Sequence, residues 1–446
     1  MISPLRNQTY RRLFAAQVIA LTGTGLATVA LALLAYDLAG ADAGAVLGTA
    51  LAIKMIAYVG VAPVVGAFAD RLPRRGFLVA MDGVRAAIVA TLPFVDQIWQ
   101  IYVLIFLLQS ASASFTPMFQ ATIPDVLPDE KDYTRALSLS RLAYDLESLL
   151  SPTIAAALLA FVSFHWLFAG TALGFLGSAL LVLSTVIPQA TTVAHRGSLY
   201  SRTTRGMRIY LATPRLRGLL SLNLAAAAGG AMVLVNTVVI VQSTLGRPEA
   251  DVAVALAAFG GGSMLAALFL PRILDRLPDR TLMLAGGGLL AGGLAGMAMA
   301  SEGDAVRWSV LLATWFVAGL GYSAVLTPSG RLLRRSSHQR DRPALFAAQF
   351  ALSHACWLLT YPLAGWLGAE TGMTTALLVL GGLAALGIAA AFLLWPANDP
   401  DTIEHVHDDL PLDHPHVRGA AKVGRGVRHV HAFVIDDYHR HWPERG

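Results

Sequence analysis

Histidine is concentrated at one end of the chain, in a spacing that suits metal ligation. Eight of the twelve histidines lie after Trp395 and form four His-x-His pairs. Residues i and i+2 of an extended strand point to the same side, so each pair can offer two imidazoles to one ion. The pairs are His405 and His407, His414 and His416, His429 and His431, and His439 and His441.

Acidic residues lie between these histidines, whereas cysteine is absent from this segment. A ligand set of imidazoles and carboxylates without thiolate suits Ni, Co, Zn or Cu(II) better than Cu(I), Mg or Ca. We therefore predict a His-rich tail over residues 397–446 that binds such an ion. Two other interpretations stay open, a solvated low-complexity tail and a pH-responsive segment. The apolar stretch 432–435 predicts that part of the tail docks as a strand or short helix.

A second group of chemically capable residues lies inside apolar stretches. Lys54, Glu147 and His354 each lie about ten residues into such a stretch, which at about 1.5 Å per residue is near the middle of a membrane. Ionisable groups are costly at that depth, so they are functional candidates. Glu147 is the candidate proton carrier, because Asp145 can be neutralised by Arg141 at i, i+4 spacing. Lys54 can serve as its counter-ion, and His354 is either a ligand or proton carrier or a structural histidine.

The rest of the chain is typical of a polytopic membrane protein. It is 55% hydrophobic and 14% charged, with a mean hydropathy of +0.59, against roughly 25% charged residues in soluble domains. Apolar runs long enough to cross the hydrocarbon core recur from Phe14 to Trp395. Backbone polar groups in lipid must be satisfied within the segment, so we expect an all-α protein. The twelve predicted spans lie near 14–36, 44–68, 77–95, 98–119, 137–160, 165–187, 218–242, 250–271, 281–300, 308–327, 345–367 and 373–395.

Basic residues predict the orientation of these spans. With a cytoplasmic N-terminus, nineteen Arg and Lys residues fall in inner loops and two, Arg247 and Arg307, in outer loops. This bias and the even span count place both termini in the cytoplasm. The basic linker 188–217 lacks an aromatic stacking platform, so we expect it to contact anionic lipid and not nucleic acid.

The spans divide into two related halves. The sequence Asp-Arg-Leu-Pro at 70–73 recurs at 275–278, an offset of 205. Thr-Pro at 116–117 recurs at 327–328, and Pro152 corresponds to Pro362. We predict a six-helix bundle over 1–187, the linker 188–217, a second six-helix bundle over 218–396, and the tail. Such repeats are typical of transporters that rock two bundles about a midplane site.

The loop between the second and third spans carries a family signature. Its sequence from Gly66 to Arg75 is Gly-Ala-Phe-Ala-Asp-Arg-Leu-Pro-Arg-Arg, and it resembles the signature loop of the major facilitator superfamily, with Pro73 where glycine is usual. The resemblance implies twelve helices in two bundles, with spans two, five, eight and eleven along the seam between them. It also implies a gating role for Gly66, Asp70, Arg71, Arg74 and Arg75. The i, i+3 spacing of Asp82 and Arg85 in span three predicts a structural pair that supports this loop.

The opening Ser-Pro-Leu-Arg-Asn at 3–7, together with the tail, is similar to bacterial nickel-resistance permeases of the NreB type. This resemblance implies export of Ni, with Co as a second cargo, driven by the proton gradient across the bacterial inner membrane. Two alternatives stay open. One is an exporter of amphipathic organic compounds, drugs or siderophores, with a regulatory tail, and the other is a membrane metal sensor that does not transport.

Several classes of protein are excluded by what the sequence lacks. The lone Cys356 excludes a disulfide framework. No Gly-x-x-x-x-Gly-Lys-Ser/Thr loop for ATP is present, and no soluble domain carries a Ser-His-Asp or metal-hydrolase constellation. We therefore expect a transporter that is not an enzyme, needs no cofactor for transport, and acts as a monomer on a small molecule or metal ion exchanged against protons.

Overall fold

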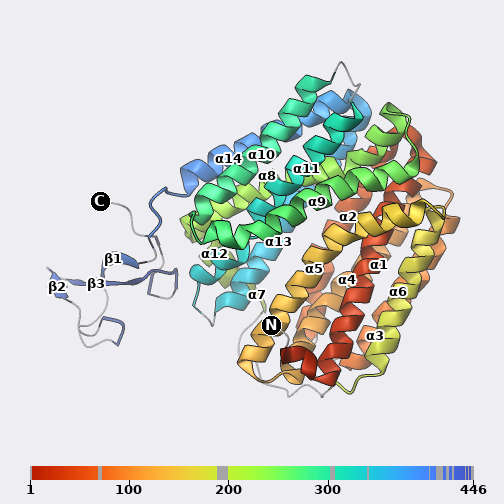
Figure 1. Ribbon diagram of the computed structural model, residues 1–446. Helices are drawn as coiled ribbons and strands as arrows, with labels where there is room; N and C mark the ends of the chain where they lie inside the picture. The colour runs from red at the N-terminus through yellow and green to blue at the C-terminus, as the bar shows by residue number, and fades with distance from the viewer. Residues whose placement is uncertain are drawn as a thin grey trace.

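The computed structural model describes most of the chain. The described residues are 3–68, 73–187, 199–301, 307–338, 341–400 and, in the tail, 402–407, 415–417, 421–423, 426–436, 438–439 and 441–442. The membrane part is helical, as predicted, and is arranged as two bundles that lie side by side (Figure 1).

The first bundle contains six long helices. Their bounds are α1 (Gln8–Ala39), α2 (Ala43–Phe68), α3 (Arg74–Thr91), α4 (Ile98–Val126), α5 (Glu130–Leu159) and α6 (His165–Leu183). Helix α5 begins several residues before the predicted span because the Asp129 side chain caps it, accepting a hydrogen bond from the Asp132 backbone N–H at 2.9 Å. A side-chain cap satisfies one of the backbone donors that an α-helix leaves free at its start.

The opening residues tie the first helix to the rest of this bundle. Asn7 caps α1 by accepting from the Tyr10 backbone N–H at 3.0 Å, and its amide donates to the Val126 carbonyl at 3.2 Å. Ser3 Oγ donates to Asp132 Oδ1 at 2.6 Å. These contacts connect α1 to the end of α4 and the start of α5, so the opening motif has a structural role.

The second bundle repeats the plan and is joined to the first by the linker helix α7 (Leu199–Ala212). Its helices are α8 (Pro214–Val239), α9 (Glu249–Leu274), α10 (Asp279–Ala300), α11 (Trp308–Leu326) with the short α12 (Ser329–Arg335), α13 (Arg342–Thr371) and α14 (Met373–Leu394). Within the described residues, 10 stretches are long and apolar enough to cross a membrane, and one of them, Gln8–Val61, covers α1 and most of α2.

The two bundles meet where α2 packs on α13 and α5 packs on α9, a region that we call the seam. Glycines allow α2 and α13 to approach closely at one end of it, called here the tight end. A Cβ at Gly48 would lie 2.5 Å from the Tyr361 carbonyl oxygen, and one at Gly365 would collide with the Gly44 carbonyl. Side-chain hydrogen bonds at this end run from Trp366 Nε1 to Thr49 Oγ1 at 3.2 Å and from Ser243 Oγ to Tyr36 Oη at 3.0 Å.

The tail adds a small β-sheet to the helical protein. Strands β1 (Thr402–His407), β2 (Ala421–Val423) and β3 (Gly426–Ala432) form an antiparallel sheet in the order β1-β3-β2. The register pairs Thr402 with Ala432 and His405 with His429. The sheet lies off the end of the second bundle, beyond α12 and α14 (Figure 1).

Apolar residues after β3 fasten the tail to the second bundle. Phe433 and Ile435 are 3% and 1% exposed and belong to one core cluster with Tyr210 of α7, Leu219 of α8 and Trp395 at the end of α14. The apolar stretch that the sequence singled out therefore docks, and it does so mainly as extended chain following a strand.

Candidate functional site

Lys54, Glu147 and His354 come together at the seam from three different helices. Lys54 on α2 interacts electrostatically with Glu147 on α5 and with His354 on α13. All three side chains are half-buried. The Glu147 carboxylate lies against α1, since a Cβ at Gly25 would be 2.8 Å from its Oε1. Glu147 of the first bundle and His354 of the second therefore both interact electrostatically with the Lys54 ammonium.

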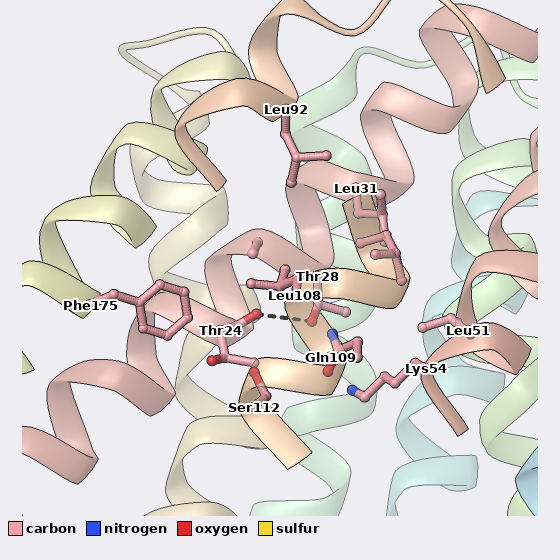
Figure 2. Close-up of a pocket in the computed structure, with 12 residues that line it drawn as sticks. Thr24, Thr28, Leu31, Leu51, Lys54, Leu92, Leu108, Gln109, Ser112 and Phe175 are labelled. Atoms are coloured by element: carbon pink, nitrogen blue, oxygen red, sulfur yellow. Dashed lines mark hydrogen bonds between the residues drawn. The ribbon is translucent and has the colours of Figure 1, made fainter. Parts of the chain in front are cut away.

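A pocket with a mixed polar and apolar lining extends from Lys54 into the first bundle. Lys54 lines it together with Gln109 and Ser112 of α4 and with Thr24 and Thr28 of α1 (Figure 2). The remaining lining is apolar and includes Leu31, Leu51, Ile105, Leu108 and Phe175. Sequence analysis missed the hydroxyl and amide residues of this pocket. The sequence pattern that could have revealed them is a pair of polar side chains at i, i+4 spacing within an apolar run, as at 24 and 28.

His354 connects the two bundles through its ring. The ring stacks on Tyr58 of α2, with centroids 5.8 Å apart and planes at 13°. Its Nδ1 lies 2.7 Å from the Phe350 carbonyl, one turn earlier in α13. A carbonyl only accepts, so Nδ1 carries the proton and Nε2 presents its lone pair. This tautomer suits a ligand or a proton acceptor at the seam.

Other predicted residues of this region fall outside what the structure describes. Arg141 and Asp145 lie on α5, one turn apart, but their side chains are outside the described residues. The surroundings of Gly66 in α2 also lie outside the described part of the chain, as do the residues Asp70 and Arg71. Their proposed roles stay predictions.

Asp82 and Arg85 of α3 form a buried ion pair, Oδ1 to Nη2. Asp82 is 0% exposed, and its second oxygen accepts from Ser178 Oγ of α6 at 2.7 Å. The Arg85 guanidinium lies between two aromatic rings, 4.3 Å from the centroid of Phe115 and 4.5 Å from that of Phe175. Because Phe175 also lines the pocket, this pair supports one wall of the pocket.

Replacing Asp82 by Ala is expected to destabilise the protein strongly. The substitution leaves the Arg85 charge buried without its partner, which costs about 3–5 kcal/mol in comparable cases. Thermal unfolding of the purified protein in detergent measures the loss, with Asp96→Ala, an exposed aspartate after α3, as the matched control. Equal melting temperatures for the two variants would show that the ion pair contributes little.

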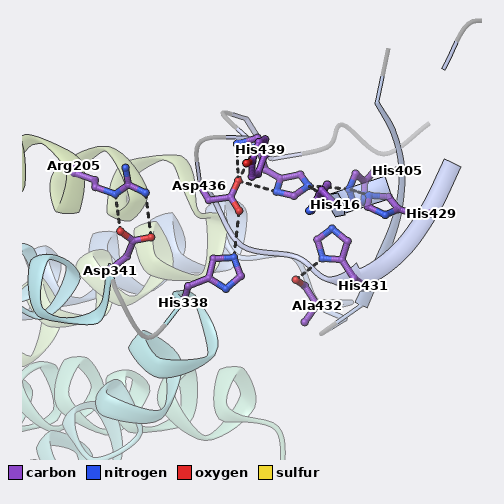
Figure 3. A network of polar contacts seen from close by, with 11 residues as sticks. Arg205, His338, Asp341, His405, His416, His429, His431, Ala432, Asp436 and His439 are labelled. Atoms are coloured by element: carbon purple, nitrogen blue, oxygen red, sulfur yellow. Dashed lines mark hydrogen bonds and ion pairs between the residues drawn. The ribbon is translucent and has the colours of Figure 1, made fainter. Parts of the chain in front are cut away.

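The tail gathers five histidines into one cluster. His405, His416, His429, His431 and His439 each offer a ring nitrogen, and these atoms lie within 4.8 Å of one another (Figure 3). The cluster takes at least one histidine from each sequence pair. His407 has its ring near those of the cluster but is not one of the five, and His441 is exposed. His414 lies outside the described residues.

The chemistry of the cluster suits a metal ion. Nε2–Nε2 distances are 2.9 Å between His405 and His439, 3.0 Å between His429 and His405, and 3.3 Å between His416 and His439. Burial, with a smaller contribution from neighbouring imidazoles, lowers the pKa of His405, His416 and His429 to about 4. These rings are therefore neutral at physiological pH, the form that binds metal.

Comparison with known proteins identifies the membrane part. The model of the Major Facilitator Superfamily matches residues 13–309 and 219–419 of the chain. The chain belongs to the major facilitator superfamily. One relative, the uncharacterized MFS-type transporter YfiS of Bacillus subtilis (strain 168), is 25% identical over 328 residues, which cover 72% of this chain and 77% of that protein.

Solved structures of other superfamily transporters share the fold. A mutant of the nucleoside transporter NupG superimposes with a TM-score of 0.70 at 14% identity, covering 87% of this chain and 100% of that one. An inward-facing, unoccupied bacterial homolog of the human lysosomal transporter Spinster gives 0.69 at 13% identity, with 88% and 97% coverage. A D-xylose–proton symporter gives 0.66 at 15%, with 87% and 98%. The protein is thus a membrane transporter of this superfamily.

The superfamily signature region has a counterpart in the second half, with its charges exchanged. Arg74 at the start of α3 pairs with Asp125 of α4, Nη1 to Oδ2. At the matching position in the second half, Asp279 at the start of α10 pairs with Arg331 of α12, with Nε 3.0 Å from Oδ1. The contact is kept in both halves while the acid and the base have changed places.

The next arginine in each half performs the same task. Arg75 donates to the Leu183 carbonyl at the end of α6. Arg280 donates to the Trp395 carbonyl at 2.7 Å and to the Phe392 carbonyl at 3.1 Å, at the end of α14. The last carbonyls of an α-helix have no partner within the helix, so each arginine satisfies one such end.

Exchanging the charges of the first pair is expected to be tolerated, whereas reversing one charge is not. Arg74→Asp puts two carboxylates together at a mostly buried position, and we expect a loss of about 3 kcal/mol. Adding Asp125→Arg recreates the arrangement of the second half and is expected to recover most of it. Melting temperatures of the single and double variants test this, and a double variant no more stable than the single would contradict it.

Proposed function

We propose that this transporter exports divalent transition-metal ions, Ni and Co in particular, in exchange for protons. The observation that carries the proposal is the five-histidine cluster held against the end of the second bundle. Clustered imidazoles select borderline divalent metals over Mg or Ca. In this function the tail collects ions from the cytoplasm and raises their concentration near the transport path.

Proton coupling is assigned to the seam. Protonation of Glu147 removes its attraction to Lys54, so the local interactions of α5 and α2 differ between the two protonation states. A ligand can bias a two-state equilibrium only through such differential interactions. His354, whose ring connects α13 to α2, is the proposed partner for the passing ion.

We further propose a location and a conformation for the structure. The arginine bias of the loops supports a bacterial inner-membrane protein with both termini in the cytoplasm. On this orientation the tight end of the seam faces outward, and the bundles are joined there by the α2–α13 contact. The structure would then correspond to a state that takes up cargo from the cytoplasm.

Metal uptake into inverted membrane vesicles tests the proposal. With an imposed proton gradient, vesicles containing the protein are expected to accumulate Ni or Co, and a protonophore is expected to stop the accumulation. His405→Ala with His439→Ala is expected to slow uptake at low metal concentration and to leave uptake at saturating metal unchanged. No accumulation of Ni, Co or Zn above vesicles that lack the protein would refute a metal cargo, and would leave a membrane metal sensor if the tail still binds.

A second candidate function is favoured by the lining of the pocket. Most of its residues are apolar, among them Leu51, Leu108 and Phe175, which suits an amphipathic organic cargo. In that case the tail would regulate transport. Efflux of a fluorescent amphipathic dye from cells, insensitive to the two histidine substitutions, would favour this alternative.

A further inference from the structure

Three histidines of the tail cluster have their tautomers fixed by oxygen acceptors. Nδ1 lies 3.0 Å from the Ile403 carbonyl in His405, 2.8 Å from the Ala432 carbonyl in His431, and 2.9 Å from Asp436 Oδ1 in His439. Carbonyl and carboxylate oxygens only accept, so each Nδ1 carries the proton and each Nε2 presents a lone pair. Metal-binding histidines are held in this way by carboxylates or backbone carbonyls.

The lone pairs of these rings converge on one point. The Nε2 atoms of His405 and His439 face each other at 2.9 Å, and two lone pairs at that distance repel unless a cation lies between them. Nε2 of His431 is buried and has no hydrogen-bond partner among the described residues. His416 and His429 bring further Nε2 atoms to the same place.

The spacing of the nitrogens suits a single ion. Metal–imidazole bonds are about 2.1 Å long, so nitrogens on one ion are separated by about 3.0 Å at right angles and about 4.2 Å when opposite. The contacts of 2.9, 3.0 and 3.3 Å match the shorter value. All five nitrogens lie within 4.8 Å of one another, slightly more than the longer value, so small shifts of the rings bring them to one ion. Five imidazoles therefore surround one position, in place of a separate ion at each pair.

Asp436 connects this cluster to the membrane part. Its Oδ1 accepts from His439, and its Oδ2 lies 3.2 Å from Nε2 of His338, in the connection between α12 and α13 (Figure 3). The backbone N–H groups of Tyr438 and His439 each donate to the same Oδ1 at 2.8 Å. The Asp436 carboxylate is 3% exposed, so these contacts hold it in one position between the cluster and His338.

The docking contacts lie on both sides of this aspartate. Phe433 and Ile435 are buried against the second bundle, and the Arg215 guanidinium of α8 lies 5.1 Å from the centroid of the Trp442 ring. The segment 433–442 therefore contains the docking residues, Asp436 and the ligand His439. Fixing His439 restricts the same stretch of chain that touches the bundle.

We propose that the tail holds one divalent metal ion through the five histidines, and that this ion fixes the tail on the α12–α13 connection through Asp436 and His338. The inference rests on the proposed function for its choice of metal, but it assigns the tail a regulatory site where that function needs only a collector of ions. Occupancy of the site is thereby communicated to α13, the helix that carries His354 at the seam.

Metal binding to the full-length protein in detergent, combined with hydrogen–deuterium exchange, tests the inference. Titration with NiCl2, CoCl2 or ZnCl2 is expected to give one tight site per chain. Metal is expected to slow exchange in 402–407, in 426–442 and in the connection 336–341. Binding of several ions per chain, or unchanged exchange in 336–341, would overturn the proposal.

Two variants distinguish the effect of Asp436 on metal affinity from its effect on the connection between α12 and α13. Asp436→Asn is expected to weaken binding by about 10–100-fold, the usual effect of losing the partner of a metal-bound histidine, and to abolish protection of 336–341. His338 is not one of the five metal-binding histidines, so His338→Ala is expected to keep the metal affinity of the wild type and to lose only the protection of 336–341. His441→Ala, a tail histidine outside the cluster, is the matched control. Wild-type behaviour of both Asp436→Asn and His338→Ala would refute the role of Asp436.

One further variant guards against simple unfolding of the tail. Among the described residues the His429 ring contacts only other histidine rings, so in His429→Ala exchange of 433–436 without metal is expected to match the wild type while metal affinity falls. The inference and the proposed function can fail separately. Transport by vesicles without tail binding in detergent removes the inference alone, whereas tail binding with metal-dependent docking but no metal flux removes the proposed function alone.

Discussion

Glu147→Gln is expected to reduce proton-driven metal uptake to the level of vesicles without the protein. Glutamine preserves the size of the side chain beside Gly25 of α1 but cannot release a proton. The side chain at position 147 is then uncharged throughout transport, and Lys54 has no carboxylate partner in any conformation. A proton gradient therefore no longer favours one conformation over the other.

Two measurements make this prediction specific. Metal counterflow, in which labelled ion exchanges for unlabelled ion without a proton gradient, is expected to continue, because the pocket and the tail are intact. Glu370→Gln, the same change at an exposed position near the end of α13, is the matched control and is expected to behave as the wild type. Uphill uptake that survives in Glu147→Gln would assign proton coupling to another residue.

Gly365→Val is expected to prevent the two bundles from closing at the tight end of the seam. Any Cβ at this position collides with the Gly44 carbonyl, and backbone cannot move aside as a side chain can. Overpacking of this kind costs about 1–3 kcal/mol, which shifts a two-state equilibrium by about 5- to 150-fold. Transport that requires closure at this end is therefore expected to fall by about the same factor.

Labelling of a cysteine placed at Thr49 reports on closure directly. In the parent protein Thr49 accepts a hydrogen bond from Trp366 across the seam, and Cys356 is replaced by Ala so that it does not react. We expect faster labelling of the new cysteine in Gly365→Val than in the parent. Gly382→Val of α14, where an added Cβ meets nothing within 4 Å, is the control. Equal labelling rates in all three would show that the glycine contact does not hold the end closed.

Hydropathy and charge made the membrane part predictable from sequence, because lipid requires long apolar helices and ionisable residues are rare within them. Lys54, Glu147 and His354 stood out for that reason, and the spacing of Asp82 and Arg85 predicted their contact. The pocket was less visible, since Thr24, Gln109 and Ser112 are uncharged and their convergence depends on how α1 and α4 pack.

The arrangement of the histidines in the tail could not be predicted from the sequence. The pattern predicted metal ligands and grouped them as His-x-His pairs, because local spacing describes only neighbours in the chain. The cluster instead depends on the β1–β3 register, which sets His405 opposite His429, and on η7 (Pro415–Val417) and the segment after β3. The role of Asp436 in connecting the cluster to the membrane part could not be predicted either, since its second contact, His338, is far away in sequence.

The exchanged charges of Arg74–Asp125 and Asp279–Arg331 also bear on how the chain assembles. In a chain with two similar halves, a helix of one half can pair wrongly with a helix of the other during synthesis, a known hazard of duplicated chains. Pairing the start of α3 with α12 would put Arg74 beside Arg331, and pairing the start of α10 with α4 would put Asp279 beside Asp125. Each wrong match joins two like charges, one of them on a mostly buried side chain, Arg74 or Asp279. The reversal therefore disfavours exchange of helices between the two halves.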